Sequence, residues 1–213
     1  MKVAALVLAA GYARRFGSDK RLLPVHEPSS VENTVDQLPL LKYTLSKYLS
    51  VFDQCVVVVR EPDPALLVLE RMPDVVIARQ PNARAGMGDN IALAMQHPEV
   101  TTCDAIAIAL ADMPMVQTQT LITLREQAQR DRIVCPQFES QRGHPVILGG
   151  ELFADLSQLG GDIGARRVLS AHAELMVDIP VDDEGVLIDI DTAADWERWR
   201  NRPYGVGIAS SNC

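Results

Sequence analysis

The chain has 213 residues, of which 47% are apolar and 23% charged, and its formal net charge is -8. This length suits one α/β domain with a substantial core and is short for two. The acidic balance, without a stripe of basic residues, argues against a nucleic-acid partner, and the lack of a run of about 18 apolar residues argues against a membrane span.

Strands and helices are predicted to alternate along most of the chain. Short apolar, β-branched runs predict buried strands at residues 3–8, 55–59, 75–78, 104–110 and 132–135. Helical spacing between them predicts helices at residues 31–50, 64–71, 89–96 and 117–130. This alternation indicates an α/β fold with a mostly parallel sheet and helices on both faces.

Shorter strands are predicted in the later part of the chain, at residues 144–148, 175–178 and 186–190. Glycine pairs separate them, which is typical of turns. We expect at least one of these strands to run antiparallel, as a small addition to the sheet.

A last helix is predicted over residues 192–200. Thr192 would cap it, and Asp195 stands at its third helical position, as in a capping box. No linker interrupts the chain, so we expect one domain over residues 1–200 and a loosely ordered tail over residues 201–213.

The four cysteines, Cys55, Cys103, Cys135 and Cys213, are scattered and form no metal-binding pattern. Such spacing is typical of reduced thiols, which predicts a cytoplasmic protein.

A glycine-rich loop with two cations follows the first strand. Gly11 and Gly17 permit tight turns that leave backbone amides free, and Arg15 and Lys20 add two positive charges. A polyphosphate is bound by this combination, although a surface turn with solvated charges has the same appearance. The loop contains neither Gly-x-Gly-x-x-Gly nor Gly-Lys-Ser/Thr, which argues against an NAD oxidoreductase and against a P-loop.

Two later segments deliver carboxylates. Asp112 follows the apolar strand at residues 104–110, and Asp191 ends the strand predicted at residues 186–190, with Asp189 on the same side by the two-residue period. Ligands of open parallel sheets lie beyond the carboxyl ends of the strands, and Mg²⁺ prefers carboxylate and phosphate oxygens. We therefore expect Asp112 and Asp191 to share Mg²⁺, the alternative being that each only caps a helix.

A histidine between glycine and proline, in Gly143-His144-Pro145, opens a strand, and Arg166 offers an anion contact in a later glycine-rich loop. No pairing of a nucleophile with a base is evident. An acceptor that is a phosphate monoester would need none, because its second pKa of about 6 leaves it ionised at neutral pH.

Together these segments resemble the MobA-like nucleotidyltransferase family, and within it the molybdenum cofactor cytidylyltransferases. The resemblance spans most of the chain and rests on Leu8-Ala9-Ala10-Gly11, Arg15-Phe16-Gly17, Lys20, Gly86-Met87, Asp112-Met113-Pro114, Gly143-His144-Pro145, Gly161-Asp162-Ile163-Gly164-Ala165-Arg166 and Asp189-Ile190-Asp191-Thr192. It implies a Rossmann-like three-layer fold.

The resemblance also implies an activity, the Mg²⁺-dependent transfer of CMP from CTP to the terminal phosphate of the molybdenum cofactor with release of pyrophosphate. Arg15, Lys20 and Asp112 would be catalytic, and Asp112 and Asp191 would hold the metal. The nucleotide would contact Leu8, Ala9, Ala10, Gly11, Arg15, Gly17, Lys20 and Gly86. The pterin acceptor would contact Gly143, His144, Pro145 and Arg166, and a molybdenum hydroxylase would receive the product.

Ala9-Ala10 favours CTP, because relatives that use GTP resemble Leu-Ala-Gly-Gly and an added methyl leaves less room for a base. GTP or another triphosphate is the alternative, as is a sugar phosphate or polyol phosphate acceptor. A non-catalytic cofactor carrier would not need the cations and aspartates together. Asp89, at a predicted helix start, would repel a phosphate, so that helix start is not expected to bind one.

Overall fold

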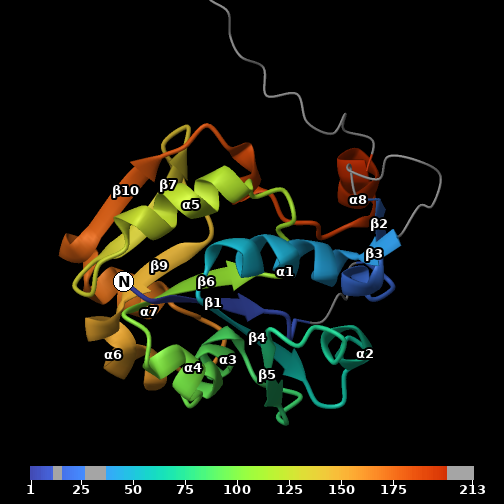
Figure 1. The fold of residues 1–213 in the computed structure, drawn as a ribbon, viewed down its shortest axis with the longest axis horizontal. Helices are drawn as coiled ribbons and strands as arrows, with labels where there is room; N and C mark the ends of the chain where they lie inside the picture. The colour runs from blue at the N-terminus through green and yellow to red at the C-terminus, as the bar shows by residue number, and fades with distance from the viewer. Residues whose placement is uncertain (12–15, 27–36, 201–213) are drawn as a thin grey trace, which may run out of the picture.

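A twisted sheet forms the centre of the computed structural model, which describes residues 1–11, 16–26 and 37–200 (Figure 1). The strands are β1 (Val3–Leu8), β2 (Pro24–His26), β3 (Gln37–Pro39), β4 (Gln54–Arg60), β5 (Val75–Gln80), β6 (Ala105–Leu110), β7 (Ile133–Phe138), β8 (Gln141–Arg142), β9 (Val146–Gly149) and β10 (Met176–Pro180). The α-helices are α1 (Leu40–Val51), α2 (Leu66–Leu69), α3 (Met87–Ala94), α4 (Pro98–Thr101), α5 (Thr118–Gln127), α6 (Phe153–Ser157), α7 (Arg166–Ala171) and α8 (Ala193–Arg200). Four 3-10 turns complete the described elements: η1 (Lys20–Leu22), η2 (Gly150–Leu152), η3 (Ala173–Leu175) and η4 (Glu184–Leu187).

The main sheet has the strand order β10-β7-β9-β6-β1-β4-β5, with β8 paired to β7. Neighbouring strands run parallel from β6 through β1 and β4 to β5, and β10 runs parallel to β7. Only β9 and β8 run against their neighbours within this described sheet. The expected α/β fold with an antiparallel addition is confirmed, and β2 and β3 form a separate antiparallel pair that the sequence did not predict.

The alternation of β1 divides the core between the two faces of the sheet. Val3, Ala5 and Val7 join the cluster packed under α1 and α5, whereas Ala4 and Leu6 join the cluster packed against α3, α4, α6 and α7. Figure 1 shows these two helical layers on opposite sides of the strands. A three-layer molecule follows, because every residue of β1 is buried on one face or the other.

The helix predicted over residues 31–50 is wrong at residues 37–39. The structure has β3 at Gln37–Pro39 and begins α1 at Leu40. Pro39 precedes the helix, and the residue before a proline is biased towards extended backbone, so Leu38 stays in a strand. Residues 27–36 lie outside the described part of the chain.

The strand predicted over residues 186–190 is also wrong, since η4 and irregular backbone occupy this segment. Asp183 explains the turn. Its buried carboxylate accepts hydrogen bonds from the backbone N–H of Gly185 (3.0 Å) and of Gln117 (2.9 Å) and from the hydroxyl of Thr120 (2.7 Å). This Asx-type turn fixes the segment against the start of α5 in place of a sheet partner.

The cap of the last helix is confirmed. The Asp195 carboxylate accepts a hydrogen bond from the Thr192 N–H at 2.8 Å, and the Thr192 hydroxyl accepts one from the Asp195 N–H at 3.2 Å. No helix in the described residues is long and apolar enough to cross a membrane. The tail predicted over residues 201–213 lies outside the described residues.

Candidate active site

A cavity of about 730 Å³ opens at the carboxyl ends of the parallel strands. Its lining includes the end of β1 and the residues that follow it, Leu8 to Gly11, and the end of β6 with Leu110 to Asp112. The register pairs Leu8 with Leu110, so β1 and β6 end level with each other, while β4 runs on from Val58, the partner of Leu8, to Arg60. The cavity therefore occupies the edge where ligands of open α/β sheets bind.

The loop after β1 lies against this cavity. Leu8, Ala9 and Ala10 are buried, whereas a Cβ at Gly11 would meet nothing within 4 Å. Gly17, farther along the loop, has φ of +77°, a left-handed conformation that glycine adopts at little cost. Gly17 does not line the cavity. Arg15, the predicted phosphate ligand, lies outside the described residues.

Lys20 joins the two predicted metal ligands. Its ammonium nitrogen lies 2.8 Å from Asp112 Oδ2 and 3.0 Å from Asp191 Oδ1, and all three residues line the cavity. Burial lowers the pKa of Lys20, but the two ion pairs outweigh it, so the pKa lies above its ordinary value. The structure thus brings together three residues that are widely separated in the sequence.

Arg21 holds this cation in place, and the sequence did not single it out. Its buried guanidinium donates to both oxygens of Asp19 at 2.6 and 2.8 Å, to both oxygens of Asp63 at 2.8 and 2.9 Å, and to the Ala9 carbonyl at 2.5 Å. A guanidinium has five N–H groups, and these five bonds use all of them. Arg21 therefore ties η1 to the loop after β1, and Lys20 is presented from a fixed turn.

Asp189 adds a third carboxylate, which the sequence prediction placed beside Asp191 without assigning it to the metal. Oxygens of Asp112, Asp189 and Asp191 lie within 4.8 Å of one another. Burial raises the pKa of the Asp189 carboxyl, and the charges of Asp191 and Asp112 raise it further. The segment is held in place by the Ile190 N–H, which donates to the Asp112 carbonyl at 2.9 Å.

This carboxylate group fits a divalent cation. Asp112 Oδ1 is buried and accepts no hydrogen bond from any described residue, which leaves a costly unpaired acceptor beside two further carboxylates. Mg²⁺ and Mn²⁺ take oxygen ligands, often one or two carboxylates together with phosphate oxygens. A cation bound there would satisfy Asp112 and relieve the repulsion that raises the pKa of Asp189.

Gly143, His144 and Pro145, predicted to contact the acceptor, do not line the described cavity. A Cβ at Gly143 would lie 2.2 Å from the Val186 carbonyl oxygen, and the His144 N–H donates to that carbonyl at 2.8 Å. Burial lowers the pKa of His144 despite the nearby charge of Asp112, and its buried Nδ1 has no hydrogen-bond partner in the part of the chain that the structure describes. The segment thus packs directly against η4.

Of two other residues predicted to contact ligands, only one lines the cavity. Gly86 lines the cavity and precedes α3, where its N–H donates to Asp89 Oδ2 at 2.7 Å. Asp89 therefore caps the helix with its own carboxylate. Arg166 begins α7, is exposed and does not line the cavity. Asp162, from the same glycine-rich loop, does line it.

Comparisons with known proteins identify a family for the chain. A family model described as the MobA-like NTP transferase domain matches residues 5–175. No curated protein sequence matches the chain significantly.

Solved structures share the fold. A homologue of Mycobacterium tuberculosis Rv0371c from Mycobacterium sp. strain JC1 is 27% identical, with a TM-score of 0.72 over 92% of this chain and 94% of that one. Rv0371c of M. tuberculosis H37Rv, in complex with manganese, is 23% identical, with a TM-score of 0.69 over 95% and 100%. Molybdopterin-guanine dinucleotide biosynthesis protein A from Archaeoglobus fulgidus is 20% identical, with a TM-score of 0.62 over 92% and 96%.

Proposed function

The chain belongs to the MobA-like NTP transferase domain family, and from this premise we propose that it transfers CMP from CTP to the terminal phosphate of the molybdenum cofactor, with release of pyrophosphate. The observation that carries the proposal is the meeting of Lys20, Asp112 and Asp191 beside the loop after β1. We include residues 1–200 in the catalytic domain, place the protein in the cytoplasm and propose a molybdenum hydroxylase as the recipient of the product.

The residues of this chain bind and align two anions. Backbone amides of Ala10 and Gly11 and the ammonium of Lys20 face the triphosphate, and Arg15 adds a guanidinium from the same loop. A phosphate oxygen of the acceptor attacks the α-phosphorus, a new P–O bond forms, and the bond from the α-phosphorus to the bridging oxygen of pyrophosphate breaks. The electron pair of that bond leaves with pyrophosphate, so charge neutralisation at Lys20 assists departure.

No general base is required, because the acceptor phosphate is already ionised at neutral pH. Asp112, Asp189 and Asp191 would hold a divalent cation, which we propose to be Mg²⁺. When bound, this ion would supply charge neutralisation to the polyphosphate. Manganese in the related Rv0371c structure supports a divalent site in this fold.

CTP is proposed as the donor because Ala9 and Ala10 are both buried at the cavity wall, where a methyl group limits the room for a base. GTP is the second candidate, since the A. fulgidus neighbour is described by a guanine dinucleotide product. The same neighbour's description supports a pterin acceptor. Gly143-His144-Pro145 and Arg166 remain proposed acceptor contacts, and a sugar phosphate or polyol phosphate is the alternative acceptor.

The test combines the protein with Mg²⁺, the pterin cofactor and CTP, GTP or ATP in turn, and identifies the products by mass. The expected result is a cytidylylated pterin and one pyrophosphate per product. Asp112→Ala should abolish pyrophosphate release while circular dichroism stays unchanged. Preferential use of GTP would refute the alanine argument, and cofactor binding without turnover of any triphosphate would indicate a carrier.

A further inference from the structure

Two buried amide side chains lie at the end of the cavity opposite the carboxylates. Gln80 ends β5, and Asn90 lies on α3 and lines the cavity. Asp112 follows β6, which is separated from β5 by β1 and β4. Three strand spacings of about 4.8 Å put the two ends about 14 Å apart, the length of an extended nucleotide. With the phosphates at Lys20, the base would lie near Asn90.

The hydrogen bonds of this amide pair fix which atom of Asn90 remains available. The backbone N–H of Asn82 can only donate, and it donates to Gln80 Oε1 at 3.1 Å. The Gln80 Nε2 group in turn donates to Asn90 Oδ1 at 3.1 Å. The oxygen of Asn90 is therefore committed, and its Nδ2 amino group is left as a donor.

This donor has no partner within the described chain: among residues 1–11, 16–26 and 37–200, none accepts a hydrogen bond from Asn90 Nδ2. Both Gln80 and Asn90 are only 7% exposed. The Nδ2 atom itself keeps some exposure and belongs to a residue of the cavity wall, so this donor faces the space that a ligand would fill. Its complement is a hydrogen-bond acceptor on the ligand.

We propose that Asn90 Nδ2 donates to the acceptor edge of the nucleotide base, and that Gln80 is a positioning residue that sets the polarity of this contact. The inference rests on the proposed function, because it takes the ligand to be a nucleoside triphosphate. Cytosine presents two neighbouring acceptors, O2 and N3, whereas the corresponding edge of guanine presents one acceptor and two N–H donors. A fixed donor at Asn90 therefore favours cytosine, which offers it two acceptors where guanine offers one beside two donors.

The decisive variant is Gln80→Glu. The carboxylate introduced there still accepts from the Asn82 N–H but cannot donate to Asn90, so the Asn90 amide turns over to donate to it. Its carbonyl oxygen then faces the base. The ratio of kcat/KM for CTP to kcat/KM for GTP is expected to fall about tenfold or more, because two acceptors, the Asn90 oxygen and the cytosine edge, would then face each other without a hydrogen bond. Inhibition by magnesium tripolyphosphate, which has no base, is expected to stay unchanged.

Asn90→Asp is an independent second variant, because it presents a carboxylate oxygen to the base without any turn of the amide. The same fall in the CTP to GTP ratio is expected. Gln80→Met is the matched control, since it fills the same space, removes the orienting bond and should lower the ratio less than Gln80→Glu.

The outcomes separate the two proposals. Failure of the unsubstituted protein to use any triphosphate would refute the proposed function. If it uses CTP and both Gln80→Glu and Asn90→Asp keep its base preference, the polarity inference is overturned and the function stands. An equal loss for CTP, GTP and tripolyphosphate would mark the pair as structural and would also overturn the inference.

Discussion

Lys20 places a positive charge between two of the carboxylates that would hold a metal ion. Its ammonium bridges Asp112 and Asp191, and the five bonds of Arg21 fix the turn that carries it. At the level of single residues, the site is therefore partly neutralised before any ligand binds.

Lys20→Met should strengthen metal binding and weaken catalysis. Without the ammonium, the carboxylates attract a free cation more strongly, and Mn²⁺ affinity measured by electron paramagnetic resonance without nucleotide should rise about fivefold, from about 0.5 kcal/mol for each of the two ion pairs. The kcat/KM for CTP should fall, because the triphosphate loses a cation. Lys2→Met, exposed at the opposite end of β1, is the control. Unchanged Mn²⁺ affinity would remove Lys20 from the metal site.

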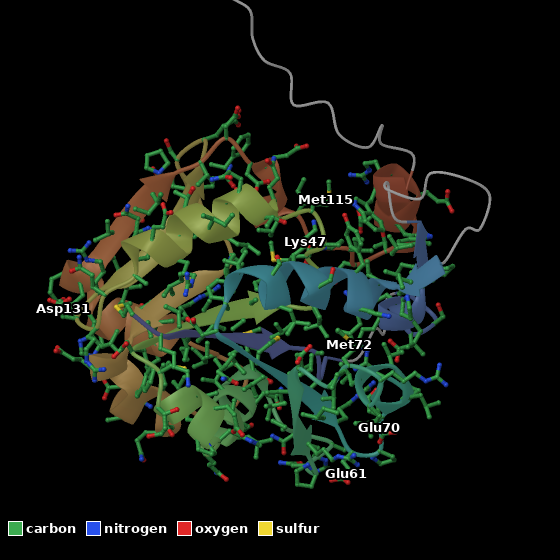
Figure 2. All side chains as sticks on the ribbon, viewed as in Figure 1. Lys47, Glu61, Glu70, Met72, Met115 and Asp131 are labelled. Carbon is green, nitrogen blue, oxygen red and sulfur yellow. The ribbon has the colours of Figure 1, made fainter. Side chains whose placement is uncertain are left out.

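Lys47 gives a prediction about pH. Its Nζ donates to the Pro114 carbonyl at 2.6 Å and the Val116 carbonyl at 3.0 Å, and Figure 2 labels it on α1 near Met115. Burial lowers its pKa from 10.5 to about 8, against the opposing charge of Asp183. A neutral amine still has two N–H groups, which is enough for both carbonyls.

The direction in which stability changes with pH follows from this lowered pKa. Between about pH 8 and 10.5 the unfolded chain binds a proton at Lys47 that the folded chain has lost, so its contribution to stability rises with pH. The difference in unfolding free energy between the unsubstituted protein and Lys47→Met should therefore grow from pH 8 to pH 10 in urea titrations. Burial also raises the pKa values of Cys55 and Tyr48, and taking the difference between the two proteins cancels their contribution to the pH dependence. A constant difference would contradict the lowered pKa.

At the scale of elements, the apolar strands and the longer helices could be predicted because hydrophobic periodicity records burial. The segment with Asp189 and Asp191 could not, since its alternation resembles a strand while Asp183, a single buried carboxylate, folds it into a turn against α5. The sequence correctly placed Asp112 after a strand and paired it with Asp191, although Asp191 ends no strand. The long-range anchoring by Arg21 depends on residues brought together only by the fold.

Gly143→Ala tests the packing of η4. The added Cβ would lie 2.2 Å from the Val186 carbonyl oxygen, so η4 must move, at a cost of about 1–3 kcal/mol. Turnover should fall as well, because η4 leads directly into Asp189 and Asp191. Gly11→Ala is the matched control for stability, since a Cβ there meets nothing within 4 Å and the urea midpoint should not change. Equal midpoints for both variants would contradict the collision.

At the scale of the whole molecule, α8 packs from outside the main sheet against the segment that carries Asp189 and Asp191. Trp196 and Trp199 are each 7% exposed and pack with Val25, Leu40 and Ile190 in a core cluster of their own. Ile190 stands between the two carboxylates Asp189 and Asp191. The last helix thus buries apolar surface that fixes the metal-binding segment.

Trp196→Ala should destabilise the protein by about 3–5 kcal/mol, the usual cost of removing a buried tryptophan. Mn²⁺ affinity should fall with it, because Ile190 loses a packing partner. A chain ending at Arg200 is the control and should keep the urea midpoint and the Mn²⁺ affinity of the full chain, as the proposed domain of residues 1–200 requires. Loss of stability without loss of Mn²⁺ affinity would show that α8 does not support the site.

Because β9 runs antiparallel to its neighbours, residues that precede a strand can also lie at this edge of the sheet. In an all-parallel sheet, only residues leaving a strand reach the rim where ligands bind. Here β9 is paired with β6 so that Val146 lies opposite Ile108, and the chain entering β9 arrives where the chain leaving β6 departs. His144, just before β9, and Asp112, just after β6, thereby become neighbours. This part of the rim is therefore built both from residues that follow a strand and from residues that precede one.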